Sequence, residues 1–105
     1  MQEVYLPLLK LLPIDEGDDL KIYALNGRVG QVMPPCYCDK DAYFSVQQGQ
    51  IRLDFEAGPR IMQAHESEFL PAGSVFQLES LTDSRAKLVM PVQASLSFDL
   101  PDERI

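Results

Sequence analysis

Histidine, cysteine and basic residues are all scarce in this 105-residue chain. It has one histidine, two cysteines, and nine lysines and arginines against sixteen aspartates and glutamates, a formal net charge of −7. One histidine leaves no Ser-His-Asp arrangement that local sequence supports, and no helix with paired histidines for zinc. The acidic balance repels phosphate backbones and anionic lipid headgroups, which argues against nucleic-acid and membrane partners.

Targeting segments are also lacking. The apolar stretch 4–14 has no basic residue before it and is interrupted by Pro7, Lys10 and Pro13. It is therefore predicted to be neither a signal peptide nor a membrane span.

Cys36 and Cys38 lie two residues apart, and on an extended strand this spacing is at the far edge of disulfide geometry. We therefore expect free thiols and a cytoplasmic protein.

Turn residues recur at short intervals along the chain, and apolar and polar residues alternate between them. The clearest case is 51–56, where three apolar residues alternate with three charged ones. Further strands are predicted at 43–46, 60–63, 75–80 and 85–92. Period-two alternation with almost no helical periodicity predicts a single all-β domain that spans the whole chain.

The spacing of the turn residues resembles the two motifs of the cupin superfamily. The first motif places a glycine before and after a set of metal ligands, and Gly30 and Gly49 stand at the matching interval. The second motif contains Pro-x-Gly, which is present here as residues 71–73. The resemblance covers residues 30–80 and implies a cupin-like antiparallel jelly-roll β-barrel.

The ligand positions of these motifs carry other residues. Cys36, Cys38, Ala42 and Phe76 stand where the family has two histidines, a glutamate and a third histidine. Alanine and phenylalanine offer no donor atom, whereas a transition metal needs three or four converging donors. We therefore expect no cofactor. The alternative is zinc, copper or iron held by Cys36 and Cys38 with help from a neighbouring aspartate, in a metal-dependent enzyme of the dioxygenase or isomerase type that the resemblance implies.

The two thiols have more than one interpretation. Side chains two residues apart on a strand share a face, so the resemblance places Cys36 and Cys38 inside the barrel. They are interpreted first as small apolar core residues, with a soft-metal site or redox-sensing chemistry as alternatives. The lone histidine, His65, lies in a polar corner and is expected to be exposed.

Strand parity gives the barrel an apolar interior. The residues predicted to line a pocket there are Cys36, Cys38, Ala42, Phe44, Phe76, Leu88 and Met90. Such a lining suits a small apolar or aromatic ligand. The leading hypothesis is a non-catalytic small-molecule binding or regulatory protein with a metal-free pocket. The metal-dependent enzyme and a structural or oligomerisation domain with a filled barrel are the alternatives.

The two ends of the chain carry further predictions. Residues 1–14 are predicted to form a dimer contact, because cupins commonly pair and because residues 4–12 are too apolar for a free edge. The alternative is that this segment closes its own barrel. The acidic run 15–19 is predicted to be a solvated loop, and residues 99–105 a frayed tail.

Overall fold

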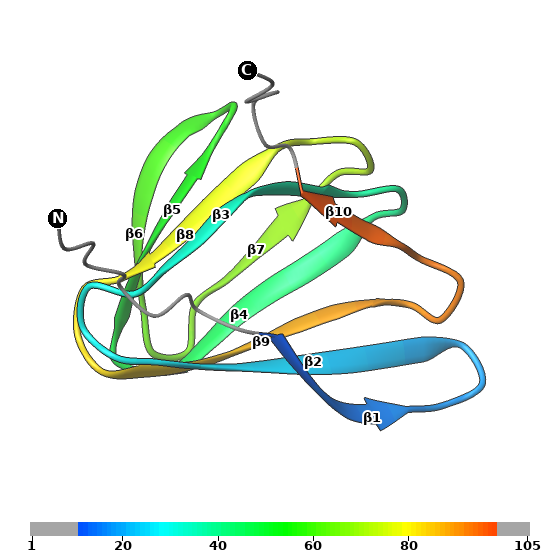
Figure 1. The fold of residues 1–105 in the computed structure, drawn as a ribbon, viewed down its shortest axis with the longest axis horizontal. Coiled ribbons are helices and arrows are strands. Elements are labelled where there is room, and N and C mark those ends of the chain that lie inside the picture. Colours follow the sequence, from blue (N-terminus) through cyan, green and yellow to red (C-terminus); the bar gives the residue numbers. More distant parts are fainter. Residues whose placement is uncertain (1–10, 99–105) are drawn as a thin grey trace, which may run out of the picture.

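The computed structural model describes residues 11–98, whose regular secondary structure is entirely β-strand (Figure 1). In chain order the strands are β1 (Leu11–Glu16), β2 (Leu20–Gly27), β3 (Val32–Cys38), β4 (Ala42–Gln48), β5 (Gln50–Phe55), β6 (Gly58–Gln63), β7 (Ser67–Leu70), β8 (Phe76–Ser80), β9 (Ser84–Pro91) and β10 (Leu96–Phe98). Within this range no helix is long and apolar enough to cross a membrane. The predicted frayed tail and residues 1–10 of the predicted dimer contact lie outside the described residues.

Two five-stranded antiparallel sheets form the walls of a barrel. Sheet A has the order β1-β2-β9-β4-β7, and sheet B has the order β10-β3-β8-β5-β6. Figure 1 shows the chain passing repeatedly from one sheet to the other, with the β1–β2 hairpin at the lower edge of the barrel. This confirms the predicted all-β jelly-roll architecture.

Each strand predicted from alternation falls on an observed strand, namely β4, β5, β6, β8 or β9. In β9 the alternation is complete, because every second residue from Ser84 to Met90 is buried. The buried side chains of both sheets meet in one core between them. Since each antiparallel strand has one face on this core, period two is enforced along its length.

The acidic run 15–19 is not the continuous loop that the sequence predicts. Its first two residues, Asp15 and Glu16, are not in a loop but extend β1, where they pair with Ile22 and Lys21 of β2. Only residues 17–19 form the turn, which the Gly17 amide closes by donating to the Leu20 carbonyl oxygen at 2.8 Å. All five residues are exposed, so the expected solvation is observed.

Two turn residues behave as predicted. Gly49 joins β4 to β5 with φ of +81°, and a Cβ at this position would lie 2.3 Å from the Asp83 carbonyl oxygen. A side chain therefore cannot fit without backbone movement. His65 is exposed in the turn between β6 and β7, where its amide donates to the Val46 carbonyl oxygen at 2.8 Å.

Candidate functional site

The structure brings the seven predicted pocket residues together in the barrel core. They come from four strands: β3 for the cysteines, β4 for Ala42 and Phe44, β8 for Phe76, and β9 for Leu88 and Met90. None of them has more than 2% of its surface exposed. A cavity that admitted water would leave accessible surface on its lining, so the interior is packed around these side chains. Ligand binding by this set stays a prediction.

The two thiols are part of this packing and are free, as expected. The Cys36 thiol contacts the Phe76 carbonyl oxygen at 3.7 Å, and the Cys38 sulfur lies 3.9 Å from the Met90 sulfur. Burial, and to a smaller extent the neighbouring Cys38, raises the pKa of the Cys36 thiol to about 12. Cys36 is therefore protonated at neutral pH, and a thiol is a poor nucleophile and a poor metal ligand.

The residues around the thiols do not fit the metals that cupins hold. Between Leu11 and Phe98, no group of three or more histidine, cysteine, aspartate or glutamate side chains could hold a metal ion. The nearby aspartates are engaged at the surface, where Asp39 accepts from the Ser95 amide at 2.8 Å and Asp41 from the Ala72 amide at 2.9 Å. The two thiols have the Met90 sulfur beside them, 3.9 Å from Cys38, but no histidine or carboxylate of the described chain forms with them a group that could hold a metal ion.

An apolar hollow of about 250 Å³ lies at the end of sheet B where β5 ends and β8 begins. Its lining residues are Pro35, Asp54, Phe55, Val75, Phe76 and Gln77. The register between β3 and β8 shifts between Met33 and Cys36, because two consecutive prolines cannot donate to the ladder. The Pro34-Pro35 pair is the sequence signal for this irregularity.

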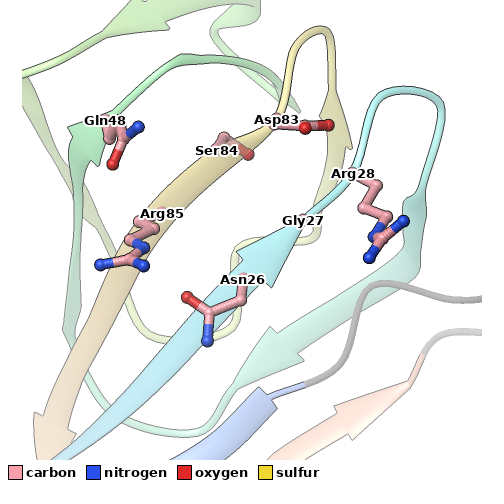
Figure 2. A pocket seen from close by; sticks show the side chains of 7 residues that line it. All are labelled: Asn26, Gly27, Arg28, Gln48, Asp83, Ser84 and Arg85. Atoms are coloured by element: carbon pink, nitrogen blue, oxygen red, sulfur yellow. The ribbon is translucent and has the colours of Figure 1, made fainter.

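A polar groove of about 400 Å³ lies at one end of sheet A. Its lining residues are Asn26, Gly27, Arg28, Gln48, Asp83, Ser84 and Arg85 (Figure 2). The register places Asn26 and Gln48 opposite Arg85, on either side of it, and Figure 2 shows Asn26 between the two arginines. The ion pairs within residues 11–98 involve Arg52 and Arg60, so neither groove arginine is neutralised by a described residue.

The polar groove was missed because it has no local sequence signal. Its residues come from three stretches of chain that only the sheet register brings together. Asp83, the one acidic residue of the groove, accepts a hydrogen bond at 3.2 Å from the Val29 amide in the loop between β2 and β3. The groove is thus a cationic spot on an acidic protein.

No protein-family model and no curated protein matches the sequence. Solved structures match by fold. An RmlC-like cupin protein from Desulfovibrio desulfuricans has a TM-score of 0.72 at 13% identity, over 80% of this chain and 82% of that one. KdgF from Halomonas sp. has a TM-score of 0.73 at 20% identity, over 86% of this chain and 84% of that one.

A further match is the DMSP lyase DddQ from Ruegeria pomeroyi, with a TM-score of 0.79 at 15% identity, over 92% of this chain and 54% of that one. Matches of this kind include an enzyme as well as proteins of unstated activity, and at such identities the likeness carries the architecture alone. The fold predicted from the turn motifs is confirmed: this chain has the cupin fold.

Proposed function

We propose that this protein is a non-catalytic small-molecule-binding protein, and that its ligand occupies the apolar hollow on sheet B. The observation that carries this proposal is the combination of a packed barrel core with an open hollow directly beside it. Phe76 belongs to both, since it is buried in the core and also lines the hollow. The ligand site therefore lies next to the predicted pocket rather than within it.

The positions of the lone histidine and of Cys36 support a binding function, because neither side chain lines the hollow. The lone histidine is exposed in a turn, and the high pKa of the Cys36 thiol keeps it neutral. General acid–base catalysis and thiolate attack both need a titratable group that is accessible to the substrate and has a pKa near the working pH. Cys36 meets neither condition, and His65 is exposed in a turn but is not among the residues that line the hollow.

The walls of the hollow define the ligand class. Pro35, Phe55 and Val75 supply apolar contacts, and Asp54 and Gln77 add polar atoms. Asp54 already accepts from the Arg52 guanidinium at 3.1 Å, which reduces its attraction for a cation. Pockets for drug-sized ligands have volumes of about 300–1,000 Å³. The smaller hollow of about 250 Å³ therefore suits a neutral, ring-sized molecule that donates one hydrogen bond.

The test is a titration of ¹⁵N-labelled protein with phenol, indole and cyclohexanol, followed by amide chemical shifts. We expect phenol or indole to move the amides of Phe55, Val75 and Gln77. Val75→Trp should abolish these shifts by filling the hollow, whereas Ile61→Trp is the matched control on β6, away from the lining residues. Val75 is 39% exposed and Ile61 57%, so neither replacement disturbs the core.

Two outcomes would overturn this proposal. Shifts centred on Leu88 and Met90 would show that the barrel interior opens to the ligand, as the sequence analysis predicts. Saturable shifts on adding zinc(II) or iron(II) that disappear in Cys36→Ser with Cys38→Ser would instead support the metal-dependent alternative.

A further inference from the structure

The polar groove is built around one row of side chains that crosses three strands of sheet A. Arg85 lies between the buried Ser84 and Ala86 of β9, so its side chain points to the outer face of the sheet. Asn26 of β2 and Gln48 of β4 are its partners on either side. An amide side chain therefore flanks the guanidinium on each neighbouring strand.

A β-bulge brings Gln48 into this row. The pairing of β4 with β9 shifts between Val46 and Gln48, and without this shift Gln47 would lie opposite Arg85. The Gln47 amide instead donates to the Ser45 hydroxyl at 3.0 Å, within its own strand. Bulges re-aim side chains and are enriched beside functional sites. Here the bulge makes Gln48 a lining residue of the groove.

The groove gathers positive charge on a chain whose formal net charge is −7. Arg28 follows directly after β2 and is exposed, and Figure 2 shows Asn26 between Arg28 and Arg85. Lys87 follows two residues after Arg85 and is also exposed on the outer face of β9. Against these three cations the groove has one acidic lining residue, Asp83. Its local potential is therefore opposite in sign to the charge of the chain.

The two arginines select the charged part of a ligand. A guanidinium stays charged at physiological pH, and its planar fork of N–H donors matches the oxygens of phosphate. One guanidinium is enough for a carboxylate, whereas a phosphate monoester has a charge of about −1.5 to −2 at pH 7 and three strong acceptor oxygens. Two arginines with two amides beside them match the phosphate monoester better.

Asp83 and the size of the groove select the rest of the ligand. The groove of about 400 Å³ falls in the range of about 300–1,000 Å³ that small-molecule sites have, and it is larger than a phosphate alone requires. The Asp83 carboxylate is held by the hydrogen bond from the Val29 amide at 3.2 Å. A carboxylate has about four acceptor sites, so Asp83 can also accept from a ligand hydroxyl.

We propose that the polar groove binds a small phosphorylated compound with a hydroxylated body. The phosphate contacts Arg28 and Arg85, and a hydroxyl group donates to Asp83. This site is separate from the apolar hollow, because the two share no lining residue. Val75→Trp should therefore leave phosphate binding unchanged, and failure of either site in an experiment says nothing about the other.

The test is a titration of the ¹⁵N-labelled chain with glycerol 3-phosphate, acetate and glycerol at constant ionic strength. Glycerol 3-phosphate should give saturable shifts at the amides of Gly27, Arg28 and Ser84. Acetate should bind at least about tenfold more weakly, since a charge-assisted hydrogen bond is worth about this factor, and glycerol should cause no shifts. Added salt should weaken binding by screening the arginines.

Matched arginine variants separate a built site from the effect of net charge. Arg28→Gln and Arg85→Gln should each weaken binding of glycerol 3-phosphate at least about tenfold. Arg52→Gln removes the same charge from sheet B, where Arg52 is paired with Asp54, and should leave the affinity unchanged. All three arginines are exposed, so the fold should tolerate these variants, and thermal unfolding checks this.

Asp83→Asn tests the hydroxyl contact. It should reduce the preference for glycerol 3-phosphate over inorganic phosphate, because the ratio of the two affinities isolates the glycerol body from the charge. An unchanged ratio would refute this contact. The absence of saturable shifts, equal affinity for acetate and glycerol 3-phosphate, or an equal loss in Arg52→Gln would overturn the phosphate site itself.

Discussion

The outer faces of the two sheets cover one common core and yet differ in chemistry. Sheet A presents an apolar row across four strands, whereas the matching rows of sheet B pair Arg52 with Glu79 and Asp54 with Gln77. The inward residues of both sheets belong to one buried apolar core, which includes Phe44 and Leu88 of sheet A and Phe76 and Leu78 of sheet B. The difference between the outer faces is therefore not a requirement of the core.

A packed barrel is compatible with a binding function. In this chain the interior is occupied by its own side chains, and open surface features lie outside: an apolar hollow on sheet B and a polar groove on sheet A.

The largest expected effect concerns the core that the two sheets share. Phe44 on sheet A and Phe76 on sheet B are both essentially unexposed, so replacing either with alanine should lower the free energy of unfolding by about 3–5 kcal/mol. Urea denaturation measures both. A much smaller loss for Phe76→Ala would indicate that the hollow reaches into the barrel, and the interior would then differ between the sheets as the outer faces do.

A pH-dependent loss of stability should come next in size. The pKa of the Cys36 thiol rises from 9.0 to about 12 on folding, because burial disfavours the thiolate. Above pH 9 the unfolded chain loses this proton while the folded chain keeps it, so the stabilisation is present below pH 9 and decreases as the pH rises toward 12. The slope is at most about 1.4 kcal/mol per pH unit.

The measurement is the free energy of unfolding of the wild type and of Cys36→Ala between pH 8 and 11. Tyrosines and lysines titrate in both proteins, so the difference between the two curves isolates the thiol. The curves should run parallel below pH 9 and converge above it. Parallel curves over the whole range would show that Cys36 ionises as easily in the folded chain as in the unfolded one.

Local features of this fold could be predicted from the sequence because local geometry alone determines them. The alternation in 51–56 follows from one buried face, and Gly49 follows from a turn with no room for a Cβ. The jelly-roll architecture was then predicted from the turn residues of the two cupin-like motifs. β1 was not predicted, because its exposed residues Asp15 and Glu16 show no alternation in burial.

Features that depend on register could not be predicted from the sequence. Ile22, Val89 and Tyr43 look like isolated apolar residues until the ladders align them. The groove likewise needs Arg85 to lie beside Asn26 and Gln48. Parity correctly placed the seven pocket residues inside the barrel, but it sets only the direction of a side chain and not the space left between side chains.

A smaller effect should distinguish the outer faces of the two sheets. Tyr43 and Phe69 form a tilted aromatic pair with centroids 5.2 Å apart, a geometry worth about 0.5–1.5 kcal/mol beyond the buried area. A double-mutant cycle with alanine at both positions gives this coupling. A coupling near zero would mean that the two rings are not held against each other in solution.

The smallest effect is expected for the matching pair on sheet B. The Arg52 guanidinium donates to Asp54 at 3.1 Å, but the two side chains are 47% and 40% exposed. Water and salt screen such a pair, so a double-mutant cycle should give only about 0.2–1 kcal/mol at low ionic strength. In 1 M salt the coupling should nearly vanish, because the screening length falls to about 3 Å. The aromatic pair of sheet A should keep its coupling under the same conditions. If the Arg52–Asp54 coupling were instead the larger one and insensitive to salt, the polar face of sheet B would be the more rigidly organised surface, and the contrast between the two faces would be reversed.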